Sequence, residues 1–171
     1  MATYQVTFKC GHTEDVVLFG PIDARMRRIE YLEQNRVCSC CAEKAHLKIV
    51  SEKNNDLGLE DLDGTEKQVK WANDIRLGFI RSCDEVLNKA LSYDYKDVAF
   101  SELEEIFKES MFDFQNETLK MKSAKFWIEN RFELDTYSVK QKFVEICRPK
   151  FIALQLKFNE QYKQNKQKNE Q

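Results

Sequence analysis

Two pairs of metal-binding residue types near the N-terminus constrain the fold more than any other feature of the sequence. Cys10 and His12 are one residue apart, Cys38 and Cys41 are two residues apart, and 25 residues separate the pairs. Each pair can bind one ion from a single turn, and four sulfur or imidazole ligands suit the tetrahedral geometry of Zn²⁺. We therefore predict one structural zinc ion bound by Cys10, His12, Cys38 and Cys41.

Two nearby residues leave the ligand assignment open. Cys40 is an alternative to Cys41, although the two-residue spacing of Cys38 and Cys41 is the commoner one. His46 is an alternative to His12. The six cysteines do not indicate a disulfide framework, because four of them fall in the first 41 residues and no export signal precedes them.

The residues around these pairs predict a small module over residues 1–50, similar to zinc-ribbon and treble-clef modules. Alternation of apolar and polar residues from Tyr4 to Phe8 predicts a strand, and residues 16–19 predict a second one. Gly11 allows a tight turn between them. Apolar residues at helical spacing predict a helix over residues 22–35, and a shorter helix over 42–50.

The rest of the chain predicts helices, and 5 Gly and 2 Pro are too few for an all-β fold. We expect an acidic linker over residues 51–64, a helical bundle over 65–161 and a disordered tail over 162–171. Thr65 and Gln68 form a capping box for the first bundle helix, to about residue 90. Further helices are expected from Ser101, over 117–131, and over 137–161 with a kink or break at Pro149. The predicted fold class is α+β, mainly α.

Charge is unevenly distributed, although the formal net charge is only -2. Residues 51–117 hold 17 acidic and 8 basic side chains, whereas residues 118–171 hold 12 basic and 6 acidic ones. A dense acidic helix face can dock on a basic surface of another protein. The candidate partner-binding residues are Asp94, Asp97, Glu102, Glu104, Glu105, Glu109 and Asp113.

A second candidate interface consists of Arg25, Arg27 and Arg28 on the predicted 22–35 helix, which could hold phosphates. Glu30 and Glu33 lie among these arginines, so we expect ion pairs within the helix instead. With no overall basic bias, direct DNA binding is not expected.

No arrangement of residues in the sequence indicates an enzyme. A closed four-ligand zinc site leaves no position for water or substrate. Cys83 and Cys147 fall on apolar helical stripes, where buried thiols are the ordinary outcome. No stretch approaches the length of a membrane span, so we expect a cytoplasmic protein.

Several strings in the sequence resemble a family of small proteins from phages and mobile elements of low-GC Gram-positive bacteria. They are FKCGHTEDVVLFGP, then CSCC, GTEKQVKWANDIR and AKFWIENR. The similarity spans about residues 4–131. The chain is similar to zinc-containing type II-A anti-CRISPR proteins, which inhibit Cas9.

This resemblance implies a zinc-ribbon-like module followed by helices, with Cys10, His12, Cys38 and Cys41 as zinc ligands. It implies Cas9 as the partner, in a bacterial host cell, and inhibition by occupancy of a nucleic-acid site. Trp71 and Trp127 fall in the two helical strings, where large core residues are expected. The alternative function is a zinc-ribbon protein that binds nucleic acid.

Overall fold

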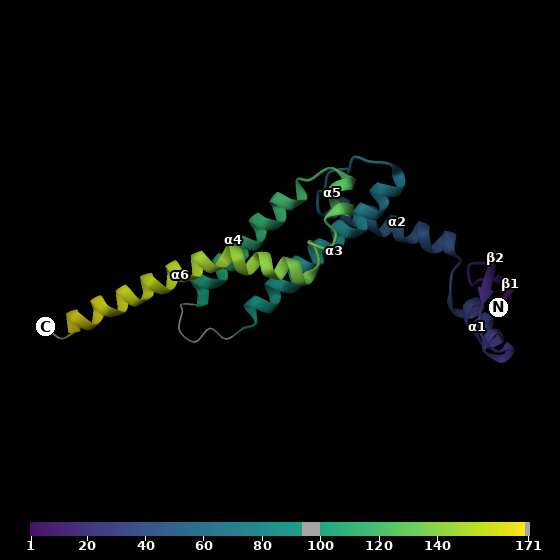
Figure 1. The fold of residues 1–171 in the computed structure, drawn as a ribbon, viewed down its shortest axis with the longest axis horizontal. Helices are drawn as coiled ribbons and strands as arrows, with labels where there is room; N and C mark the ends of the chain where they lie inside the picture. Colours follow the sequence, from purple (N-terminus) through teal and green to yellow (C-terminus); the bar gives the residue numbers. More distant parts are fainter. Residues whose placement is uncertain (94–99, 170–171) are drawn as a thin grey trace. The chain divides into compact units, whose positions relative to one another are not determined.

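A computed structural model describes residues 1–93 and 100–169 of the chain. The chain divides into two compact units, Met1–Gly58 and Leu59–Gln171. The first unit holds a two-stranded antiparallel sheet and two helices, and the described residues of the second are mainly helical, with short non-helical connections (Figure 1). The predicted class, α+β and mainly α, is confirmed.

A β-hairpin opens the first unit. Strand β1 (Ala2–Thr7) pairs antiparallel with strand β2 (Thr13–Leu18), so that Thr7 lies opposite Thr13 at the turn. The N–H of Phe8 donates to the carbonyl of His12 at 2.9 Å and closes the connecting loop. Gly11 has a φ of 79° in this loop, a conformation that glycine adopts without strain.

Two helices complete the first unit. Helix α1 spans Ile22–Asn35, as the sequence predicts, and helix α2 spans Ser39–Asp56. The expected acidic linker was therefore wrong over residues 51–56, which continue α2. The core of this unit is small: a cluster of four buried residues, Val6, Phe8, Leu32 and Cys38, with Val50 buried apart from them. A core of this size gives little hydrophobic stabilisation, so a further source of stability is needed.

The described residues of the second unit form three long helices and one short helix. They are α3 (Glu66–Leu91), α4 (Phe100–Leu119), α5 (Ala124–Glu129) and α6 (Thr136–Asn169). Helices α3, α4 and α6 contact one another, and α5 packs on α3 (Figure 1). The predicted capping box is present, because the side chains of Thr65 and Gln68 each accept a hydrogen bond from the other residue's backbone N–H.

The core of the second unit contains Trp127, which is fully buried and contacts the ring of Phe79 at 5.8 Å between centroids. Trp71 is 49% exposed, so its assignment to the core was wrong. It lies next to buried Ala72, about 100° further round the helix. Cys83 and Cys147 are buried thiols, as expected, and burial raises the pKa of Cys83 to about 12.

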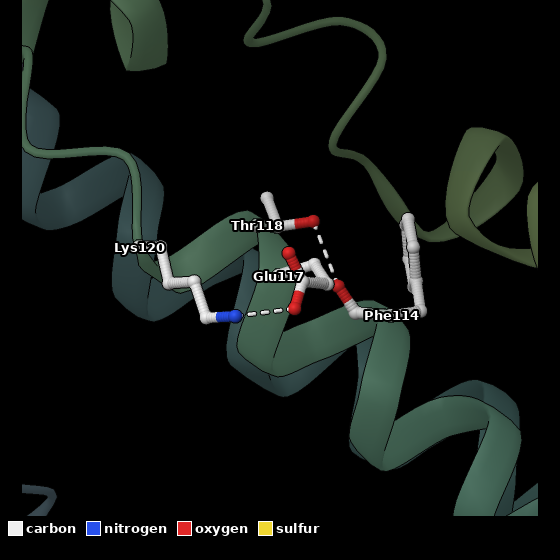
Figure 2. Close-up of polar contacts among 4 residues, drawn as sticks. All are labelled: Phe114, Glu117, Thr118 and Lys120. Atoms are coloured by element: carbon white, nitrogen blue, oxygen red, sulfur yellow. Dashed lines mark hydrogen bonds and ion pairs between the residues drawn. The ribbon is translucent and has the colours of Figure 1, made fainter.

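The single helix predicted over residues 117–131 was wrong, since α4 ends at Leu119 and α5 starts at Ala124. Near the end of α4, the Thr118 hydroxyl donates to the carbonyl of Phe114 at 2.9 Å, and Lys120 forms an ion pair with Glu117 (Figure 2). Hydroxyl bonding back to the preceding turn competes with the regular helix pattern.

The turn after α4 is held by the segment that enters the second unit. The N–H of Asp63 donates to the Lys122 carbonyl at 2.7 Å, and the N–H of Ala124 donates to the Asp63 carbonyl at 2.9 Å. The buried guanidinium of Arg76 also donates to the Glu60 carbonyl at 2.7 Å. Residues 59–64 therefore pack on the bundle, whereas we expected them to belong to a linker.

Helix α6 is longer than expected and continues through Pro149 without ending. It also extends to Asn169, so the prediction of a disordered segment over residues 162–169 was wrong; Gln171 and its neighbour lie outside the described residues.

Candidate metal centre

The hairpin loop and the N-terminus of α2 bring together the four predicted metal ligands. Cys10 and His12 lie in the loop between β1 and β2, Cys38 is the N-cap of α2, and Cys41 lies in its first turn. One ligand atom from each of the four lies within 4.8 Å of the others. Ligands from residues far apart in the sequence therefore converge on one point.

The distances within this cluster fit a tetrahedral ion. Nδ1 of His12 lies 3.3 Å from Sγ of Cys41 and 3.6 Å from Sγ of Cys38. Zinc bonds of about 2.3 Å to sulfur and about 2.0 Å to nitrogen place neighbouring S and N ligands about 3.5 Å apart in a tetrahedron. Nδ1 is therefore the ring nitrogen of His12 that faces the site.

Backbone N–H groups also point at the sulfur atoms. The N–H of Cys38 donates to Sγ of Cys10, and the N–H of Cys41 donates to Sγ of Cys38, each at 3.3 Å. The second bond lies at the N-terminus of α2, where the helix dipole favours negative charge. These donors stabilise thiolates, the form of cysteine that binds metal.

The pKa values of two of these thiols shift in opposite directions. Hydrogen bonds from the backbone N–H groups of Cys38 and then His12 lower the pKa of Cys10 to about 6. The hydrogen bond with the side chain of Cys38, together with burial, raises the pKa of Cys41 to about 11. The cluster thus stabilises one thiolate but keeps a proton on another, and a bound cation would replace that proton.

Glu14 fixes the start of α2 against the hairpin. Its carboxylate accepts hydrogen bonds from the backbone N–H of Ser39 at 3.0 and 3.1 Å and from the Ser39 hydroxyl at 2.6 Å. These bonds from Ser39 lower the pKa of the Glu14 carboxyl. The sequence did not single out Glu14. The signal that could have indicated it is a carboxylate two residues after a predicted ligand, His12.

Neither alternative ligand joins the cluster. Cys40 is exposed on the first turn of α2, and its sulfur is not among the ligand atoms that converge. His46 lies further along α2 and is also exposed. The structure thus favours Cys41 and His12 over these alternatives.

The candidate partner-binding residues lie on or before α4. Asp94 and Asp97 lie outside the described residues. Glu104 forms an ion pair with Lys108 at 2.6 Å, and Glu102 forms one with Lys157 at 3.4 Å. The remaining three are exposed and form no ion pair with the side chains that the structure describes, those of residues 1–93, 101–161 and 163: Glu105, Glu109 and Asp113.

The arginines of α1 do not pair with Glu30 and Glu33, so that expectation was wrong. The guanidinium of Arg25 lies over the Tyr4 ring at 5.6 Å, and that of Arg28 lies over the Tyr31 ring at 5.2 Å. Arg27 is exposed. Cation–π contacts leave the positive charge of these side chains uncompensated by a carboxylate.

The fold and the cluster define a class of protein in which a small Cys₃His module, suited to a metal ion, precedes a helical bundle. Comparison with protein-family models, curated proteins and solved structures finds no match to this chain. In the described part of the chain, no helix has the length and apolar character required to cross a membrane.

Proposed function

We propose that Cys10, His12, Cys38 and Cys41 hold one structural Zn²⁺ ion. Three thiolates and one imidazole are a common ligand set of structural zinc sites, which are closed and four-coordinate. The ion would join the hairpin to α2 and stabilise a unit whose core cluster has only four buried residues. Because protein ligands fill all four positions, the ion would activate no water molecule.

We further propose that the protein acts by binding a basic partner protein through α4. The observation that supports this proposal is an acidic stripe, defined here as Glu105, Glu109 and Asp113. At about 100° per residue, these three side chains lie along one side of the helix. They are exposed and form no ion pair with any described residue.

An exposed aromatic residue accompanies the acidic stripe. The Phe112 side chain is 64% exposed and lies on the same side of α4 as Glu105 and Glu109. Glu117 follows the stripe by four residues, and its charge is paired with Lys120 (Figure 2). Aromatic anchors surrounded by charged residues are typical of protein interfaces, since the ring supplies buried area and the charges supply specificity.

Cas9 is the partner that we propose, on the basis of the sequence resemblance. Cas9 holds nucleic acid in positively charged channels. An acidic helix that occupies such a channel would exclude target DNA without any chemical step. This function requires only a stable folded surface, consistent with a closed zinc site.

The test is capture of the protein by purified Cas9, with and without guide RNA, followed by measurement of target-DNA binding. We expect a complex that weakens as salt rises and that prevents DNA loading. A Cas9 sample that binds DNA equally well at saturating concentrations of this protein would contradict the proposed inhibition.

Charge reversal in the acidic stripe tests the interface itself. The variant Glu105→Lys, Glu109→Lys and Asp113→Lys should bind Cas9 on the order of tenfold or more weakly, since three attractive charges become repulsive. Glu109→Lys alone should weaken binding more than Glu104→Lys, a matched change on the same helix but outside the stripe. If these two single variants bind Cas9 equally well, the interface does not include the acidic stripe.

A second candidate function is nucleic-acid binding through α1. The observation that favours it is that Arg25, Arg27 and Arg28 form no ion pair within the described residues. In this case the protein should retain DNA at low salt and release it as salt rises. Replacing all three arginines by Gln should abolish the retention of DNA. If the native protein does not shift a DNA band at low salt, this candidate function is contradicted.

A further inference from the structure

A large cavity in the second unit plays no part in the function proposed above. Its volume is about 780 Å³, and residues of α3, α4 and α6 line it. Small-molecule sites in proteins commonly measure roughly 300–1,000 Å³ and are mostly apolar with a few polar groups. None of the three acidic-stripe residues lines this cavity.

The floor of the cavity is apolar and buried. Val86 of α3, Phe107 of α4 and Phe143 of α6 contribute to it, and all three side chains are at least nine-tenths buried in the core. The Phe107 and Phe143 rings meet edge to face, with 5.5 Å between their centroids. These three side chains favour contact with hydrocarbon, and none of them offers a hydrogen-bonding group to a polar ligand.

The rim of the cavity is basic. Lys89 comes from α3, and Lys140 and Arg148 come from α6; all three are exposed. No carboxylate of the described chain forms an ion pair with any of them. The acidic lining residue, Glu85, instead accepts a hydrogen bond from the Thr136 hydroxyl at 3.2 Å.

Lys140 and Arg148 lie on either side of three cavity-lining residues of α6, Phe143, Val144 and Cys147. Val144, 43% exposed, lies midway between Lys140 and Arg148. Positions 140 and 148 are eight residues apart, a rise of about 12 Å along the helix axis, and all three positions lie on one side of α6. An extended hydrocarbon chain lying along Val144 would therefore reach a cation at its end.

We propose that this cavity binds a single-chain fatty acid, with the hydrocarbon chain on the apolar floor and the carboxylate at the basic rim. Charge complementarity supports an anion, because the three rim cations outnumber the single lining carboxylate, Glu85. The apolar floor requires that the body of this anion be hydrocarbon. An uncharged or cationic amphiphile would leave the rim cations without a counter-charge.

Titration of the full-length protein with cis-parinaric acid, a fluorescent fatty acid, tests the proposal. We expect a saturable rise in fluorescence with one molecule bound per chain. Hexadecanoate should displace the probe at about a tenth of the concentration that 1-hexadecanol requires, since only the acid carries the charge. No saturable signal, or equal displacement by the acid and the alcohol, would overturn the proposal.

Two variants locate the site within the molecule. Val144→Trp should weaken probe binding, because the larger side chain takes up part of the cavity next to the apolar floor, whereas Leu156→Trp, at an exposed position of α6 outside the cavity, should not. Lys140→Gln with Arg148→Gln should weaken parinarate binding about tenfold, while Lys142→Gln should have no effect. Circular dichroism verifies that each variant is folded, and unchanged binding by folded Val144→Trp would exclude this cavity.

Sedimentation with vesicles distinguishes a free fatty acid from a membrane as the source of the ligand. The protein should remain in the supernatant with phosphatidylcholine vesicles that contain phosphatidylglycerol, because the proposed ligand is a single extracted chain. If the native protein instead co-sediments with the vesicles and the Lys140→Gln and Arg148→Gln variant does not, the rim cations bind a lipid surface. That result would overturn the fatty-acid site.

Discussion

Replacing Cys38 and Cys41 together by Ser is expected to remove the metal and unfold residues 1–58, while the helical bundle stays folded. The small core of the first unit cannot compensate for the loss of a structural zinc ion, whose apparent binding free energy is about 10–16 kcal/mol in zinc-finger peptides at neutral pH. The bundle has its own core, with 15 buried residues, and is a separate compact unit.

Elemental analysis and a two-dimensional amide NMR spectrum measure this outcome. The native protein should carry one zinc ion per chain, and the double variant should carry none and lose the hairpin resonances. Cys40→Ser is the matched control, because Cys40 is exposed and lies outside the cluster. A double variant that keeps stoichiometric zinc, or keeps its hairpin resonances without it, would contradict the structural role of the site.

Trp127→Ala should lower the free energy of unfolding of the bundle by about 3–5 kcal/mol, the usual cost of removing a large buried aromatic side chain. The indole is fully buried between aromatic neighbours, and its Nε1–H donates to the Met121 carbonyl at 2.8 Å. The substitution creates a cavity and removes the partner of that carbonyl.

Urea unfolding of the full chain, followed by circular dichroism, measures the effect. Trp71→Ala is the matched control and should cost less than about 1 kcal/mol, since the side chain is half exposed and packs under the guanidinium of Arg131. Equal losses in the two variants would mean that the bundle core is not centred on Trp127.

The sequence predicted helix positions well where an apolar stripe or a cap marked them. The predicted helix over 22–35 has the same bounds as α1, and the capping box at Thr65 marks the start of α3. Such signals are local, because a cap and a periodic stripe depend on residues a few positions apart.

Prediction failed where a helix buries little of its surface. Val50 is the only buried side chain that α2 contributes, so residues 51–56 carry no apolar stripe to indicate a helix. The end of α6 shows the same behaviour, since its last buried side chain in the described part of the chain is Leu154. Ion pairs such as Lys48 with Glu52 support an exposed helix without leaving a hydrophobic pattern.

Trp71 illustrates a second kind of failure. Its size suggested a core position, but the buried face of α3 is set by Ala72, Phe79 and Cys83, which contact other helices. One residue along a helix turns the side chain by about 100°, so a large residue can lie beside the core face without belonging to it.

The sequence by itself determined the two ligand pairs, the helical class and the concentration of acid on α4, because each depends on residue type and short spacing. Only the tertiary structure decided that Nδ1 of His12 faces the thiols and that Glu105, Glu109 and Asp113 lack ion pairs with the described side chains. It alone also decided that α3, α4 and α6 line an apolar cavity with a basic rim. These features join residues distant in the chain, and their positions follow from how whole helices pack rather than from any local pattern.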